Sequence, residues 1–278
     1  MEYVSLFIWL AACLAVAGIV DRLLQGALSY RLVQILVLPG AVVRNLSQSL
    51  AALMCGATLT DANAYTVNSD GVKTSGGTPS QVAGALTPVV PLLGCGAAAV
   101  VLQGAVGGPL PLSVSAPTLS SFSAQGVESF VSQTVTLVRV VALSVWRADF
   151  AQTGTWVMLV LSFGLAAGMA ISFSALKRAV VGAAVLVGAV GVLDFVLPRL
   201  GLSGGWLGSG SLSLRPSIES LAGVASVVLI VGLAGSVVVI ALVKAWNAVG
   251  AGSSASGRSA GGSRQDSDGG ETGRRKAA

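Results

Sequence analysis

Arg44, Asn45 and Gln48 are the residues whose types and spacing come closest to forming a chemical site. They lie in residues 38–59, an otherwise apolar stretch of membrane length. Polar side chains are costly in such a stretch and are functional candidates by default. At 100° per residue, Arg44, Gln48 and Cys55 fall on one helical face, with Asn45 beside it. Positions i, i+1 and i+4 are those at which a helix can present two metal ligands with a general base between them.

This stretch resembles the first active-site helix of the site-2-protease-like family of intramembrane zinc metallopeptidases. In that family the motif follows Pro-Gly and precedes Ala-Leu and a Gly-Ala turn. The matching frame residues here are Pro39, Gly40, Ala51, Leu53, Gly56 and Ala57. Where the family has two histidines and a glutamate, this chain has Arg44, Gln48 and Asn45, so the resemblance covers the frame and not the catalytic motif.

The chemistry of the family cannot be carried by these three residues. The chain contains no histidine. A guanidinium has no lone pair to offer a metal, and its charge repels zinc. Serine catalysis lacks a histidine base, and Asp194 is the one acid within an expected span, near the end of that span. We therefore expect a pseudo-metallopeptidase with no catalytic residue, no metal and no cofactor.

The composition predicts a membrane protein. Of 278 residues, 54% are hydrophobic and 10% are charged, and the mean hydropathy is +0.83. Soluble domains carry about 25% charged residues. Residues 3–20 lack a basic segment before them, which favours a retained transmembrane helix over the alternative of a cleaved signal peptide. Cys13, Cys55 and Cys95 lie in apolar or Gly-rich runs without a Cys-x-x-Cys spacing, so we expect them to be buried free thiols.

We predict an all-α polytopic membrane protein. A membrane domain, residues 1–249, precedes a disordered basic tail, residues 250–278. About six transmembrane helices are expected, joined by a polar connection at 21–31, a Pro/Ser/Gly linker at 107–125 outside the bundle, and short loops at 174–178 and 198–216. The expected spans are residues 3–20, 32–57, 82–106, 156–174, 180–197 and 218–246.

Several local features refine this outline. Pro39 is expected to kink its helix or to start a new one at Gly40. Residues 58–81 read as a short β-hairpin-like loop, with a strand at 64–67 and an Asp-Gly turn, or as a plain solvated loop. Residues 126–150 favour an interfacial amphipathic helix over a span, because a span would hold Arg139 near its centre.

Small residues and prolines predict how the helices pack. The pairs with small-xxx-small spacing are Gly164 with Gly168 and Ala184 with Gly188. The resemblance further implies that the helix containing Pro88 and Pro91 packs beside residues 32–57, that the hairpin loop follows the motif helix, and that residues 156–197 end the family's membrane domain.

The positions of the basic residues predict the orientation. Membrane proteins concentrate Lys and Arg on the cytoplasmic side. Placing the N-terminus inside puts nine basic residues inside, namely Lys73, Lys177, Arg178, Lys244, Arg258, Arg264, Arg274, Arg275 and Lys276. Six lie outside, namely Arg22, Arg31, Arg139, Arg147, Arg199 and Arg215. We expect a plasma-membrane protein with both termini cytoplasmic, a polarity that the resemblance also implies. The same bias accounts for the net charge of +5 without a nucleic-acid partner.

The intramembrane Arg44 requires a polar partner or water. Candidates are Gln48, main-chain carbonyls freed near Pro39, Pro88 or Pro91, and the loop acids Asp61 and Asp70. The expected function is an inactive site-2-protease-like protein that binds lipids and binds or scaffolds another membrane polypeptide. A small channel or transporter, or a structural subunit of a membrane complex, remains the alternative.

Overall fold

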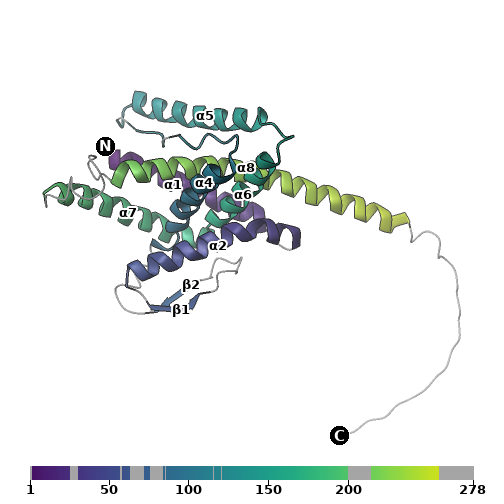
Figure 1. The fold of residues 1–278 in the computed structure, drawn as a ribbon, viewed down its shortest axis with the longest axis horizontal. Coiled ribbons are helices and arrows are strands. Elements are labelled where there is room, and N and C mark those ends of the chain that lie inside the picture. Colours follow the sequence, from purple (N-terminus) through teal and green to yellow (C-terminus); the bar gives the residue numbers. More distant parts are fainter. Residues whose placement is uncertain are drawn as a thin grey trace, which may run out of the picture. The chain divides into compact units, whose positions relative to one another are not determined.

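The computed structural model is a bundle of long apolar helices (Figure 1). It describes residues 2–25, 31–56, 58–62, 72–75, 84, 86–114, 116–119, 121–199 and 214–256. The helices are α1 (Glu2–Gln25), α2 (Arg31–Met54), α4 (Val90–Val106), α5 (Ala124–Trp146), α6 (Thr153–Met169), α7 (Phe173–Arg199) and α8 (Leu214–Ser256). Met1–Ile240 form one compact unit and Ala241–Ala278 a second.

The predicted all-α polytopic membrane class is confirmed. Five helices are long and apolar enough to cross a membrane: α1, α2, α5, α7 and α8. Two shorter apolar helices, α4 and α6, have 17 residues each. At about 1.5 Å per residue these two measure roughly 25 Å, slightly less than a hydrocarbon core of about 30 Å. Each of the six predicted spans overlaps an observed helix, with bounds that differ.

The helix bounds depart from the predictions where polar residues were taken as connections. Residues 21–25 continue α1, because Leu24 is buried beside Val33 and Val37 of α2 and Phe163 of α6. Residues 174–178, predicted as a loop, belong to the first turns of α7. Pro88 and Pro91 delay the start of α4 to Val90. The expected loop at 198–216 lies largely outside the described residues, α8 reaches Ser256, and the tail from 257 onward lies outside them altogether.

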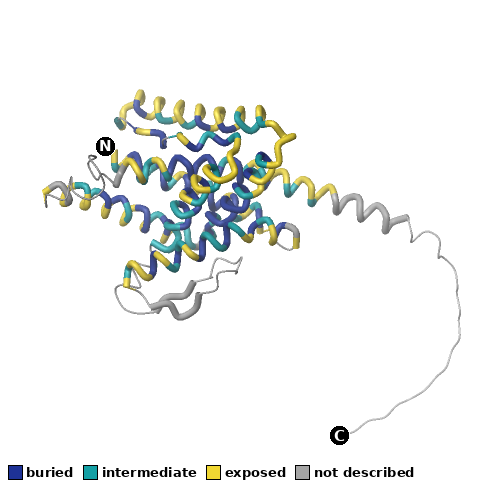
Figure 2. Tube along the Cα trace, in the orientation of Figure 1, coloured by how far each residue is buried: buried dark blue, intermediate teal, exposed yellow. Residues whose placement is uncertain are grey.

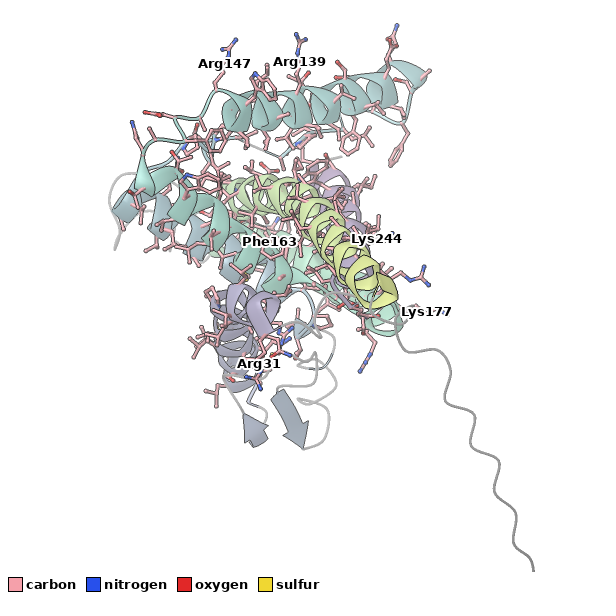
Figure 3. All side chains as sticks on the ribbon, turned by 90° about the vertical axis from the view of Figure 1, so that its right-hand side faces the viewer. Arg31, Arg139, Arg147, Phe163, Lys177 and Lys244 are labelled. Carbon is pink, nitrogen blue, oxygen red and sulfur yellow. The ribbon has the colours of Figure 1, made fainter. Side chains whose placement is uncertain are left out.

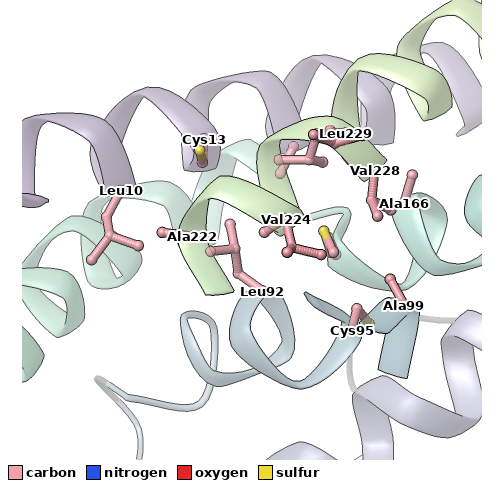
Figure 4. Close-up of a cluster of buried hydrophobic side chains, with 14 of the residues drawn as sticks. Leu10, Cys13, Leu92, Cys95, Ala99, Ala166, Ala222, Val224, Val228 and Leu229 are labelled. Atoms are coloured by element: carbon pink, nitrogen blue, oxygen red, sulfur yellow. The ribbon is translucent and has the colours of Figure 1, made fainter. Parts of the chain in front are cut away.

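Small side chains form much of the core between α1, α4, α6 and α8 (Figure 4). Without a hydrophobic driving force inside lipid, membrane helices associate by close van der Waals packing, which small residues permit. Ala99, Ala166, Ala222 and Ala225 are fully buried there. A Cβ on Gly96 of α4 would come within 3.0 Å of the Leu221 carbonyl oxygen of α8. The backbones of α4 and α8 are therefore held in close contact.

The tightest helix contact joins α2 to α6 at Pro39 and Gly40. A Cβ on Gly164 would lie 2.6 Å from the Leu36 carbonyl oxygen and 3.0 Å from Cγ of Pro39, and a Cβ on Gly168 would collide with Gly40. The predicted close approach at Gly164 and Gly168 is confirmed. The matching prediction for Ala184 and Gly188 is wrong, because both are exposed on α7.

Of the two outcomes predicted at Pro39, a kink or a new helix at Gly40, the second is wrong. Pro39 lies inside one continuous helix, α2. A proline interior to a helix removes one main-chain hydrogen bond and crowds the preceding turn. Here its ring packs against Gly164, where no side chain competes for the space. Packing against α6 therefore accompanies the continuity of α2 through this position.

Residues 109–114 and 116–119 pack against the bundle, so the prediction of an outer linker is wrong for this part of the chain. Leu110, Leu112 and Ala116 are buried in the main core. The Ser5 hydroxyl of α1 donates to the Pro117 carbonyl oxygen at 3.4 Å and accepts from the Leu119 amide at 2.7 Å. Buried irregular backbone needs such partners. Ser5 serves two of these main-chain groups and Gln103 Nε2 donates to the Leu110 carbonyl oxygen at 2.7 Å, contacts that composition does not reveal.

A two-stranded antiparallel hairpin follows α2. β1 (Thr58–Ala62) pairs with β2 (Val72–Ser75), with Thr58 opposite Ser75 and Ala62 opposite Val72, and an irregularity between Leu59 and Asp61. Both strands contact α2. The predicted hairpin is therefore present in this loop, while the strand expected at 64–67 and the Asp-Gly turn lie outside the described residues.

Candidate functional site: a buried polar cluster on α2

The helix α2 separates its residues into two faces (Figure 2). The exposed face carries large apolar residues at intervals of three, four or eight residues: Ile35, Leu38, Leu46, Leu50 and Leu53. The buried face carries Val33, Val37, Ala41, Arg44, Asn45, Gln48, Ala51 and Ala52. This is the pattern of a helix whose lipid side is apolar and whose polar side chains face protein. The sequence placed the three polar residues on one face, and the structure buries all three.

Arg44 is buried in the middle of α2, with an exposed fraction of 6%, beside Asn45 at 2%. The Arg44 Nε donates to Asn45 Oδ1 at 3.4 Å. The positive charge of Arg44 also acts on the half-buried Asp21 carboxylate of α1. Asp21 in turn accepts a hydrogen bond of 2.7 Å from Gln25 Nε2. The guanidinium therefore has a hydrogen-bond partner on its own helix and the Asp21 carboxylate of α1 in its electrostatic surroundings.

Gln48 connects the cluster to the chain just before α4. Its Nε2 donates to the Thr87 carbonyl oxygen at 3.4 Å, and its exposed fraction is 6%. In a helix the residue-91 amide would face the residue-87 carbonyl, but Pro91 has no N–H to donate. Gln48 thus bonds a carbonyl oxygen that Pro91 cannot serve. The sequence named such a carbonyl as a candidate partner of Arg44; here Gln48 donates to it, and Arg44 donates to Asn45.

Helices α2 and α4 also approach each other closely at Ser47 of α2 and Gly94 of α4. The Ser47 hydroxyl donates to the Val43 carbonyl oxygen at 2.7 Å, within its own helix. A Cβ on Gly94 would collide with that hydroxyl. The prediction that the proline-containing helix packs beside α2 is confirmed, since α2 contacts α4 along this face.

The other candidate residues from the sequence, the acids Asp61, Asp70 and Asp194, are not shown to be part of the cluster. Asp61 is paired with Lys73 in the register of the hairpin, which is described by its backbone alone. Asp70 lies outside the described residues. Asp194 does not merely face solvent at a helix end, because it is half-buried and Tyr3 Oη donates to its Oδ2 at 3.1 Å. This bond joins α7 to the start of α1.

The described residues include no group of three or more His, Cys, Asp or Glu side chains arranged to hold a metal. The three cysteines are free, with Cys13 and Cys95 buried and Cys55 half-buried. Cys13 lies 3.5 Å from the Ser226 hydroxyl, which also accepts from Trp9 Nε1 at 2.9 Å. These polar contacts hold α1 against α8, so we interpret them as part of the helix packing.

Asp21 is the member of the cluster that the sequence reading missed. It was assigned to a connection, because Asp21 and Arg22 follow an apolar run. The signal that would have found it is the i, i+4 spacing of Asp21 and Gln25, which extends a helix by one turn. With Asp21 present, the cluster offers one positive charge, one negative charge and two side-chain amides. Such a set can bind polar main-chain groups.

The fold and this cluster define a polytopic helical membrane protein with polar side chains of α2 buried inside the bundle. No family model matches the chain, and neither a curated protein nor a solved structure matches it.

Proposed function

We propose that the chain is a catalytically inactive, site-2-protease-like membrane protein that binds or scaffolds another membrane polypeptide. One observation carries the proposal: the residues at the three motif positions, Arg44, Asn45 and Gln48, are polar, buried and turned into the bundle. Polar residues in a membrane helix are expensive and persist where they serve a function. The proposal places the protein in the plasma membrane with both termini cytoplasmic.

The partner is proposed to engage the end of the polar face near Cys55. Cys55 lies seven residues after Gln48 on the same face and is half-buried, whereas Gln48 is buried. The hairpin strand β1 starts at Thr58, directly beyond it. A polypeptide with unpaired main-chain groups would find amide and charged partners along this face, which lipid does not provide.

The test is photocrosslinking from Cys55 in native membranes. A benzophenone maleimide reaches Cys55 in preference to Cys13 and Cys95, because those two thiols are buried. The matched control carries Cys55→Ser and Val192→Cys, which moves the probe to an exposed position on α7. A discrete polypeptide adduct from Cys55 and none from position 192 is expected. Equal labelling from both positions, or lipid adducts alone, would contradict partner binding.

A channel or transporter is the second candidate, and a specific observation favours it. Arg44 lies in the middle of α2. Pro88 and Pro91 lie in the neighbouring segment, where α4 starts only at Val90. Transporters use broken helices and intramembrane charges at their binding sites. Flux of ions or small solutes across vesicles containing the purified protein separates the candidates. Flux that is reduced by Arg44→Met and unaffected by Arg139→Met would favour the transporter.

A further inference from the structure

We propose that α5 lies in the membrane–water interface, with a stripe of exposed valines in the acyl chains and its charged side chains among the lipid headgroups. By length and composition α5 could equally cross a membrane. The distribution of its side chains around the helix decides between the two placements. Of its 23 residues, Gly126, Leu137 and Val141 are buried, so most of the helix faces something other than this chain.

The side of α5 that faces the bundle makes few contacts, and each of them involves a defined side chain. Phe130 packs edge-on against Trp9 of α1, with ring centroids 5.8 Å apart. Leu137 and Val141 belong to the main core. Near the middle of α5, Gln133 Oε1 accepts from the Thr118 amide at 2.9 Å. These contacts fix the rotation of α5 about its own axis.

A stripe of valines lies roughly a quarter turn from the bundle side. Its members are spaced i, i+4, i+8 and i+11 and have exposed fractions of 44–61%: Val127, Val131, Val135 and Val138. If this stripe faced water, its valine side chains would be exposed to solvent along most of the helix, which is unfavourable. Acyl chains on this side would cover it.

A polar sector follows a further quarter turn around the helix. Glu128, Ser132 and Arg139 are exposed there. Figure 3 shows Arg139 and Arg147 extending outward from α5. If α5 crossed the bilayer, Glu128 and Arg139 would meet hydrocarbon, at a cost of about 2.5–3.5 kcal/mol for a charge at the centre. A helix lying in the interface places valines and charges on opposite sides of the headgroup boundary.

The corner between α5 and α6 supplies an independent marker of the interface. Trp146, Phe150 and Trp156 are all exposed there. Trp156 Nε1 donates to the Phe150 carbonyl oxygen at 2.9 Å, and the two rings lie 5.5 Å apart. Tryptophan is enriched at the headgroup level because its ring is apolar and its N–H is polar. After this corner, α6 enters the bundle, where residues 162–169 are buried.

Spin labels placed one at a time on α5 test the proposal. The variants replace Cys13, Cys55 and Cys95 and introduce a cysteine at Val131, Val135, Val138 or Ser132. The labelled proteins are reconstituted in phosphatidylcholine vesicles with a minority of phosphatidylglycerol. Accessibility to oxygen and to a water-soluble nickel chelate reports the depth. A label at Val185, exposed in the middle of α7, serves as the transmembrane control.

The expected result is one shallow depth for the three valine positions, within about 10 Å of the phosphates, and contact of Ser132 with the nickel chelate. The Val185 label should be deep, at about 15 Å. Depth that rises to that value at Val135 and falls toward both ends of α5 would overturn the proposal in favour of a span. Protection of the valine positions from both reagents would overturn it in favour of a protein partner on the stripe.

Discussion

Gln48 of α2 donates from Nε2 to the carbonyl oxygen of Thr87 at 3.4 Å, and Thr87 stands four residues before Pro91. A side chain from one helix therefore bonds a carbonyl that a proline leaves without its usual amide. Beside it, Arg44 bonds Asn45 and interacts with Asp21. The three motif positions consequently have polar partners from the surrounding chain, as buried polar groups require.

The bond between Gln48 and Thr87 predicts a coupling between Gln48 and Pro91. Gln48→Leu removes the side-chain donor and is expected to lower the free energy of unfolding by about 1–3 kcal/mol. Pro91→Ala restores a main-chain N–H that can serve the Thr87 carbonyl. In that background Gln48→Leu should cost less, which a double-mutant cycle in mixed micelles measures. Equal costs in both backgrounds would show that the 3.4 Å contact contributes nothing.

The crossing of α2 over α6 predicts a strong response to one added methyl group. Gly164→Ala places a Cβ 2.6 Å from the Leu36 carbonyl oxygen, so the helices must separate, at a cost of about 1–3 kcal/mol. The matched control is Gly188→Ala on α7, where nothing lies within 4 Å. It should be neutral or stabilising by up to about 1 kcal/mol. Thermal unfolding of both variants in one detergent gives the comparison, and similar melting temperatures would contradict the observed crossing.

The purified protein is expected to contain no stoichiometric zinc. The chain has no histidine, and Arg44 brings a positive charge to the first ligand position of the resembling motif. Elemental analysis after a chelator wash checks this. A variant with Arg44→His and Gln48→His supplies two ligands four residues apart and should retain more zinc, which shows that the assay responds. Retention of one zinc per wild-type chain would refute the expectation.

The orientation predicted from the basic residues places Ser69 and Ser256 on the cytoplasmic side. Single cysteines at these positions, in a background without Cys13, Cys55 and Cys95, should react with an impermeant maleimide after the cells are opened and not before. The reason is the bias of Lys and Arg toward the cytoplasm. Labelling of either position in intact cells would contradict the orientation with both termini inside.

Hydropathy and helical periodicity predicted the membrane class and the burial of the polar face, because both depend on local composition. The 100° spacing placed Arg44 and Gln48 together before any contact was known. The spacing of Gly164 and Gly168 predicted a close approach, and the structure supplies Pro39 and Gly40 as the partners. These features follow from sequence neighbours three or four residues apart.

Features that depend on contacts distant in sequence were missed. Residues 107–125 read as a linker because Pro, Ser and Gly dominate them, yet Leu110 is buried there and Ser5 of α1 bonds the main chain at Pro117 and Leu119. The continuity of α2 through Pro39 coincides with packing against α6, more than 120 residues away. The same spacing rule that succeeded at Gly164 failed at Gly188, which faces outward. Spacing shows that a helix can be approached closely, and only the fold shows whether another helix does so.

The most direct test of the central claim is Arg44→Met, assayed by crosslinking from Cys55. Methionine keeps much of the volume and removes the charge, so membrane insertion should be normal. If the polar cluster serves a partner, the discrete adduct from Cys55 should be lost, while Arg139→Met, on exposed α5, should leave it intact. An unchanged adduct in Arg44→Met, or equal loss in both variants, would contradict the claim that the buried cluster on α2 is a retained binding site.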